Sequence, residues 1–290
     1  MREGTVTLAD GRAIGYAEYG VADGIPVFEF HGLPGSRHYD LRADALAAAG
    51  VRWITLERPG FGLSDPKPGR TLLDWADDVG EVADRFGFER FSVLGYSAGG
   101  PYAAACGYAR PERVGCAGLA AAVGPVFDNP ALDQFLGTQV QALLPIARED
   151  QAAALAIVRD VVKPGSDAWA ADPDGYFDTW LEGWAEIDRP AFRAKREMWV
   201  NVLAATNQRG TDTTLDDVAC MYGPWGFTPA DIRVPVRAWH GLADDLSIEP
   251  IRFVCANAPD GQLTEYPGEG HVLDERHHDD WLATLTEWAR

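Results

Sequence analysis

The most specific chemical pattern in the chain is a serine flanked by glycines, in the segment GYSAGG at 95–100. An apolar, strand-like run at 91–95 leads into it, and an alanine-rich stretch that predicts a helix follows directly. A nucleophile at such a sharp turn needs small neighbours, which Gly95 and Gly99 supply. The N-terminus of the following helix directs its N–H groups to where negative charge develops during attack on a carbonyl. We therefore predict that Ser97 is a nucleophile.

A serine hydroxyl needs a base that removes its proton. Of the six histidines, His271 lies in a glycine-rich loop, PGEGHV, that follows the last strand-like run. A base in such a loop can reach a serine at the sheet edge, so we predict His271 as the base. His277 and His278 lie in a charged run and are expected to face solvent.

The base needs an acid that orients it, and this acid is expected between the serine and the histidine in the sequence. The segment WHGLADD at 239–245 leaves a predicted strand with two acids. Asp244 is the predicted partner of His271, with Asp245 as the alternative.

A further loop, HGLPGS at 31–36, follows an early strand-like run, and its backbone can approach a bound carbonyl. The main-chain N–H groups of Leu33 and Ala98 are the predicted donors of an oxyanion hole. His31 is expected to hold this loop rather than to act as a second base.

The elements that must position these residues alternate between strands and helices along the chain. The predicted strands are 26–31, 51–56, 91–95, 114–120, 234–239 and 262–266. The predicted helices are 43–49, 72–86, 98–108 and 281–289. This alternation predicts an α/β fold with a mostly parallel sheet and helices on both faces. The opening segment, 4–19, predicts an antiparallel hairpin at the sheet edge.

The alternation stops near residue 125 and resumes near residue 234. We predict a core domain made of 1–124 and 231–290, with an inserted helical cap at 125–230. A chain of 290 residues is consistent with one domain that carries an insertion.

The predicted cap holds half of the ten tryptophans. Tyr176, Trp180 and Trp184 fall at i, i+4 and i+8, the spacing of one helix face. This stripe either packs against the main domain or lines an apolar substrate pocket, and it fits a contact in a homodimer equally well. The residues predicted to line the pocket are Tyr96, Trp180, Trp184, Trp199, Trp225 and Val272.

Composition excludes several functions. The 44 acidic against 25 basic residues give a net charge of −19, and no basic stripe is present, so nucleic-acid binding is not expected. No apolar run approaches the roughly 18 residues of a membrane span, and the first residues lack the apolar core of a signal peptide. We therefore expect no membrane association and a cytoplasmic location. The four cysteines form no CxxC pair, which argues against a disulfide framework or a zinc site.

The order Ser97, Asp244, His271 and four motifs resemble the α/β-hydrolase fold superfamily. These motifs are HGLPG, ERPGFGLSD at 57–65, GYSAGG and the late GEGH. The resemblance covers the chain except the predicted cap. Proline iminopeptidases and related capped hydrolases are most similar through their HGGPG loop, but Leu33 replaces a glycine and peptidase activity is not carried over. Haloalkane dehalogenases and soluble epoxide hydrolases have a similar loop order with an aspartate nucleophile, and Ser97 speaks against both.

The expected reaction is cleavage of an ester, thioester or lactone of a small to medium hydrophobic substrate through an acyl-enzyme. No metal or organic cofactor is expected, because a side chain or amide is assigned to every catalytic role. Hydrolysis of a C–C bond, or a cofactor-free lyase or cyclase step, uses the same triad and stays an alternative. A ligand receptor that retains the fold is a further alternative.

Overall fold

The computed structural model describes residues 1–38 and 42–288, and an eight-stranded sheet forms its centre. The strands are β1 Arg2–Thr7, β2 Ala13–Gly20, β3 Ile25–Phe30, β4 Val51–Leu56, β5 Phe91–Tyr96, β6 Val114–Ala120, β7 Val236–Gly241 and β8 Gly261–Tyr266. Their order is β1-β2-β4-β3-β5-β6-β7-β8. The β1–β2 and β2–β4 pairs are antiparallel and all other pairs are parallel. The predicted strands, the edge hairpin and the mostly parallel sheet are confirmed.

The strand order explains where a site can form. From β3 the chain crosses to β4 on one side and later returns to β5 on the other side. The chain therefore leaves β3 and β5 in opposite directions. The loops that follow these two neighbouring strands lie at the same edge of the sheet, where ligands bind in open α/β sheets. These two loops carry HGLPGS and GYSAGG.

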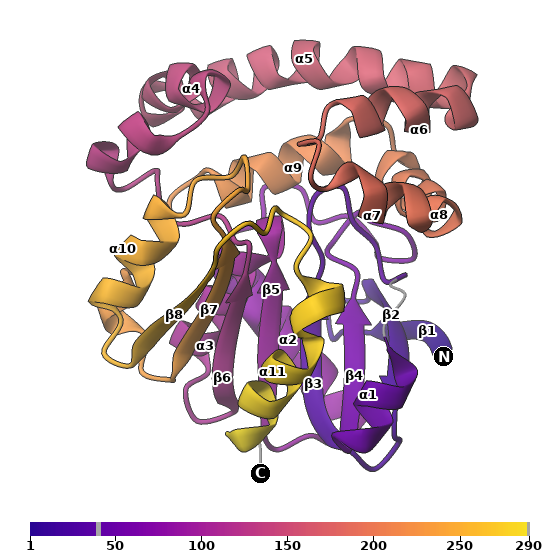
Figure 1. Ribbon diagram of the computed structural model, residues 1–290, viewed down its shortest axis with the longest axis vertical. Coiled ribbons are helices and arrows are strands. Elements are labelled where there is room, and N and C mark those ends of the chain that lie inside the picture. The colour runs from indigo at the N-terminus through magenta and orange to yellow at the C-terminus, as the bar shows by residue number, and fades with distance from the viewer. Residues whose placement is uncertain (39–41, 289–290) are drawn as a thin grey trace.

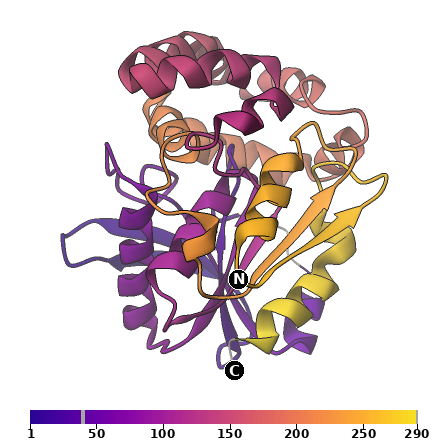
Figure 2. The same cartoon turned by 90° about the vertical axis from the view of Figure 1, so that its left-hand side faces the viewer.

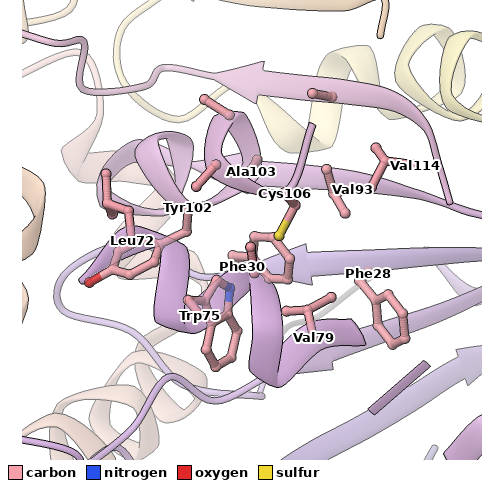
Figure 3. Packing of buried hydrophobic residues seen from close by; sticks show 14 of the residues in the cluster. Phe28, Phe30, Leu72, Trp75, Val79, Val93, Tyr102, Ala103, Cys106 and Val114 are labelled. Atoms are coloured by element: carbon pink, nitrogen blue, oxygen red, sulfur yellow. The ribbon is translucent and has the colours of Figure 1, made fainter. Parts of the chain in front are cut away.

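Helices cover both faces of the sheet, as Figure 2 shows. Helices α2 (Leu72–Phe86), α3 (Gly100–Ala109) and α10 (Glu249–Asn257) pack on one face, and α1 (Ala43–Ala48) and α11 (Asp274–Glu287) pack on the other. Figure 3 shows the first interface, where the Trp75 ring lies 5.4 Å from Phe30 and 6.2 Å from Tyr102.

Helix α2 illustrates how local sequence sets these elements. Thr71 and Asp74 form a reciprocal capping box at its start, and Gly87 ends it with a φ of +74°. Its buried residues recur at helical spacing and face the sheet. The predicted helix 72–86 is confirmed with the same bounds.

A layer of six α-helices lies over the carboxyl ends of the strands, with α5 along the top of the view in Figure 1. These helices are α4 Thr138–Glu149, α5 Gln151–Ala171, α6 Pro173–Glu182, α7 Arg189–Ala194, α8 Arg196–Asn207 and α9 Asp212–Met221. We call residues 138–221 the helical layer. It connects β6 to β7 and lies within the predicted insertion at 125–230. That this insertion is a separate cap domain remains a prediction. Among the described residues, no helix is long and apolar enough to cross a membrane.

Two expectations about the helices need correction. Helix α11 begins at residue 274 rather than at 281, and the predicted end of this helix, residue 289, lies outside the described residues. His278 is therefore inside the helix and is buried against Trp53, with 5.6 Å between ring centroids, instead of facing solvent. His278, Trp281 and Leu285 share one face of the helix. This spacing was missed because the charged residues around His278 were interpreted as a solvent-exposed segment.

Candidate active site

The turn after β5 holds Ser97 in a conformation that few residues adopt. Ser97 has a φ of +52°, in the left-handed region. A Cβ atom at residue 95 would lie 2.2 Å from the Gly99 oxygen, and one at residue 99 would lie 2.0 Å from the Phe30 oxygen. Only glycine fits at these two positions, so close packing of backbone against backbone sets the geometry of the turn.

The predicted acid and base are in contact at the end of β7 and β8. The Nδ1 atom of His271 lies 2.8 Å from Oδ2 of Asp244, and both side chains are buried. The second carboxylate oxygen of Asp244 accepts a hydrogen bond from the Leu246 N–H at 2.8 Å. Asp245 lies on the exposed side of the same turn. The geometry therefore favours Asp244 as the group that orients His271.

The surroundings of His271 make it a stronger base. Burial alone would lower the pKa of His271, but the charge and hydrogen bond of Asp244, followed by the charges of Asp188 and Asp245, raise it above the usual value near 6.5. The carboxylates therefore stabilise the imidazolium that would form when His271 takes a proton from a serine.

A buried ion pair holds the loop after β3. The guanidinium of Arg58 donates to the carbonyl oxygens of His31 and Gly32, the latter at 3.1 Å. Asp217, on α9, accepts from Arg58 at 2.6 and 2.9 Å, and neither side chain is exposed. A Cβ at Gly32 would lie 3.3 Å from Cβ of Ser97, so this loop lies directly beside the serine.

Asp217 remains ionised despite complete burial. Desolvation raises the pKa of Asp217, but Arg58 and Arg70 outweigh this effect, and the pKa is about 2. Arg70 donates to the carboxylate at 2.9 Å, and the Tyr102 hydroxyl donates to it at 2.7 Å. A buried charge with several partners of this kind keeps a fixed position.

His31 has an architectural position, in line with its predicted role. Its Nε2 atom accepts from the Arg58 backbone N–H at 3.3 Å, so Nδ1 is the donor to the Gly32 oxygen at 2.8 Å. Burial, followed by the charge of Arg58, lowers the pKa of His31 well below its usual value. A neutral imidazole with both nitrogens engaged in hydrogen bonds holds the loop.

A second carboxylate from the helical layer holds the histidine loop. Asp188, the residue before α7, accepts from the backbone N–H of His271 at 2.9 Å and from that of Val272 at 3.0 Å. It is 1% exposed. From the other side, the Tyr96 hydroxyl donates to the His271 carbonyl and accepts from the Leu273 N–H at 3.3 Å. The loop is therefore fixed by the sheet and by the helical layer together.

A small cavity brings three of the predicted catalytic and oxyanion-hole residues together. Its lining includes Ser97, His271 and Leu33, and solvent can occupy about 40 Å³ of it. Most of the lining is apolar, and the Trp184 ring lies 5.2 Å from the His271 ring. The cavity therefore accepts a reacting group and excludes most solvent from it.

The structure places the predicted pocket residues at three different sites. Tyr96, Trp184, Trp199 and Val272 line the cavity beside Ser97. Trp180 lines a neighbouring cavity and packs on Trp184 and Trp199 at 5.7 and 5.5 Å. Trp184 follows the end of α6 rather than continuing its face.

The expectation for Trp225 is wrong. This side chain is 2% exposed and belongs to the core cluster between the sheet and its helices, where it packs 5.4 Å from Phe227. Trp225 lies in the segment that connects α9 to β7, after the end of the helical layer. At this residue the chain is part of the core of the sheet domain.

Several residues of the site were not identified from the sequence. Asp188, Asp217 and Arg58 hold its loops, while Lys195 and Met198 line the cavity. Arg58 belongs to the motif ERPGFGLSD, which contributed to the family resemblance but gave no role for Arg58. No comparable signal marks the two aspartates, because their partners are distant in sequence. Among the described residues, no group of three or more His, Cys, Asp or Glu side chains is arranged to hold a metal ion.

Comparisons with known proteins agree with this architecture. A family model described as alpha/beta hydrolase fold matches residues 25–158. A non-heme chloroperoxidase from Streptomyces lividans is 36% identical over 126 residues, which are 42% of this chain and 46% of that protein. A 2-hydroxy-6-oxononadienedioate/2-hydroxy-6-oxononatrienedioate hydrolase from Cupriavidus pinatubonensis (strain JMP 134 / LMG 1197) is 37% identical over 87 residues, 29% of this chain and 30% of that protein. The matched segment thus spans less than half of each of these relatives.

Solved structures resemble the whole chain. The bromoperoxidase from Bacillus anthracis superposes with a TM-score of 0.72 at 22% identity and covers 99% of both chains. The enol-lactonase from Burkholderia xenovorans LB400 gives a TM-score of 0.67 at 16% identity, over 98% of this chain and 99% of that one. At these identities the likeness shows the fold. With the family model that matches residues 25–158 and the order of the sheet, the chain has the α/β-hydrolase fold.

Proposed function

We propose that this protein is a serine hydrolase that cleaves an ester, thioester or lactone bond through an acyl-enzyme. One observation carries the proposal: His271, whose Nδ1 atom contacts the buried Asp244, lines the same small cavity as Ser97. A histidine oriented by a buried carboxylate beside a serine on a strained turn is the arrangement that activates a hydroxyl.

In the proposed reaction, the Ser97 oxygen attacks the substrate carbonyl while Nε2 of His271 takes the hydroxyl proton. The N–H groups of Leu33 and Ala98 stabilise the negative oxygen of the tetrahedral intermediate. The intermediate collapses to an acyl-serine, and His271 gives its proton to the departing alkoxide or thiolate. Water then attacks the acyl group, with His271 again as base, and the acid is released. Asp244 orients His271 throughout and stabilises its imidazolium form.

The surroundings support a substrate that is uncharged and apolar near the reacting carbonyl. Apolar side chains form most of the cavity lining, and the rings of Trp184, Phe192 and Trp199 are among them. These groups bind hydrocarbon and exclude water from the acyl-enzyme. The names of similar structures, an enol-lactonase and the esterase RhEst1 from Rhodococcus sp. ECU1013, agree with this class of reaction.

The test is labelling with a fluorophosphonate, followed by intact mass measurement and peptide mapping. We expect one adduct on Ser97 in the wild type and none in Ser97→Ala. The variant should also lose three or more orders of magnitude of turnover on p-nitrophenyl acetate. Equal labelling or equal turnover in folded Ser97→Ala would reject the proposal.

The two neighbouring acids give a matched pair of variants. Asp244→Asn removes the charge that orients His271 and should lower kcat on the order of 10⁴-fold. Asp245→Asn should stay within about threefold of wild type, because this side chain is exposed and acts only through its screened charge. If both variants keep wild-type kcat, Asp244 is not the orienting acid.

A second candidate is hydrolysis of a C–C bond in an acidic diketone. Two similar proteins are named as hydrolases of oxo-dienedioates, and this C–C cleavage can use the same serine, histidine and acid. Product analysis separates the candidates, since ester cleavage yields an acid and an alcohol, whereas C–C cleavage yields two carbonyl fragments.

A further inference from the structure

Three cavities follow one another from the serine into the helical layer. The cavity beside Ser97 shares Leu33 and Pro34 with a second cavity. The second and third cavities also share part of their lining, the valines Val161, Val162 and Val218. The lining residues therefore form a continuous series from the oxyanion loop to the far side of the layer.

The third cavity is a wide aliphatic groove between α4, α5 and α9. Solvent can occupy about 520 Å³ of it, against about 40 Å³ beside Ser97. Aliphatic side chains from α4 and α5 form opposite walls at helical spacing, among them Val140, Leu143, Leu155 and Val158. No charged side chain of the described residues lines this groove.

The second cavity, of about 350 Å³, has a different character. Hydroxyl and amide side chains contribute to it, including Thr206, Asn207, Thr211 and Thr214, and none of them carries a charge. A neutral hydrogen-bonding section therefore lies between the small cavity at Ser97 and the aliphatic groove.

The groove leaves apolar surface in contact with water. Ile157 and Val161 are 42% and 60% exposed, and Ala154 is the buried residue of the 21-residue helix α5. Covering such a surface with hydrocarbon is favourable, at about 0.8 kcal/mol per methylene transferred from water. An aliphatic chain is the occupant that matches an uncharged groove whose lining residues continue, through the second cavity, to the cavity beside Ser97.

We propose that the groove binds the aliphatic tail of the substrate, an inference that rests on the proposed hydrolase function. The substrate class is then an ester or lactone whose reacting carbonyl, placed beside Ser97, continues through a neutral polar section into a long alkyl or acyl chain. At about 0.8 kcal/mol each, a fully buried methylene raises kcat/KM by up to about fourfold.

The experiment measures kcat/KM for p-nitrophenyl acetate, butyrate, octanoate and dodecanoate. In the wild type, we expect the dodecanoate value to exceed the acetate value at least tenfold. Val158→Trp fills the groove and should reduce this ratio to about one, each protein being referred to its own acetate rate. Ala156→Trp adds the same ring to an exposed position of the same helix, outside the groove lining, and should keep the wild-type ratio.

The outcomes separate the two proposals. Wild-type acetate hydrolysis with the same chain-length ratio in Val158→Trp overturns the tail site and leaves the hydrolase function intact. No hydrolysis and no fluorophosphonate adduct reject the hydrolase function instead. The tail site is then tested by the affinity for dansylundecanoic acid, measured in Ser97→Ala and in Ser97→Ala/Val158→Trp. The double variant should bind this probe at least tenfold more weakly. Equal affinity of the two variants would overturn the tail site.

A competing occupant is a second copy of the chain. Sedimentation velocity of the wild type and Val158→Trp tests this directly. A dimer that the substitution dissociates, without a change in the chain-length ratio, would make the groove a protein interface and overturn the tail site.

Discussion

The helical layer has two halves that differ in side-chain chemistry and packing. The aromatic half, α6–α8, has its own buried cluster, formed by Phe177, Leu181, Phe192 and Leu203. Around this cluster, several aromatic rings lie within 6 Å of each other. The aliphatic half, α4–α5, buries Leu144 and Ala154 and encloses the open groove.

The two halves are expected to control different properties. The aromatic half contacts His271, the proposed base, through Trp184 and holds its loop through Asp188. The aliphatic half contributes no lining residue to the cavity beside Ser97. Changes in the aromatic half should therefore alter turnover itself, whereas changes in the aliphatic half should alter the choice of substrate.

The largest expected effect that tests this comparison is that of Asp188→Ala. This change leaves two buried N–H groups of the histidine loop without their acceptor, at about 1–3 kcal/mol each, and frees the loop to move. We expect kcat to fall about 100-fold, because small misplacement of a catalytic group has effects of this size. Steady-state kinetics and a thermal melt measure the two effects.

Asp150→Ala is the matched control in the other half. Asp150 accepts from the Ala153 N–H at the start of α5 but is exposed. Its loss should cost about 1 kcal/mol of stability and leave kcat unchanged. Equal kinetic effects of the two variants would remove the distinction between the halves.

A smaller effect is expected for Trp184→Ala. Removing this ring admits water beside His271 and should lower kcat/KM about tenfold. Trp169→Ala removes a ring of the same size from the end of α5, where it packs on Tyr176 at 5.9 Å, away from the cavity beside Ser97. A tenfold loss in both variants would mean that general destabilisation, not the contact with His271, lowers the rate.

The smallest expected effect is a shift in pH dependence. In the proposed reaction His271 acts as a base in its neutral form, so its raised pKa should place the acid limb of kcat/KM above pH 6.5. Asp188→Asn removes a negative charge that raises this pKa, so the limb should move to lower pH. A pH–rate profile for wild type and variant measures the shift. An unchanged limb would show that Asp188 acts on the position of His271 and not on its charge.

The parts that could be predicted from the sequence depend on neighbouring residues. The turn at Ser97 was identifiable because the glycines that permit it lie two residues away on each side. The strands were identifiable because each apolar run is bounded by its own glycine or proline.

The parts that could not be predicted depend on contacts between distant residues. Asp188 and His271 are 83 residues apart, and Asp217 and Arg58 are 159 apart. Neither aspartate has a local pattern that differs from that of an ordinary surface acid. Trp225 was assigned to the pocket as one of the tryptophans of the predicted cap, and this composition does not indicate which buried surface the ring joins.

The two buried carboxylates also limit how the fold can be recombined. Grafting helices from another protein onto this sheet would remove Asp217 and leave Arg58 and Arg70 charged inside the core, at a cost of about 3–5 kcal/mol. The same graft would release the histidine loop from Asp188. A working chimera must therefore bring an acid to each of these two positions, and the helical layer is exchangeable only as a unit that carries both.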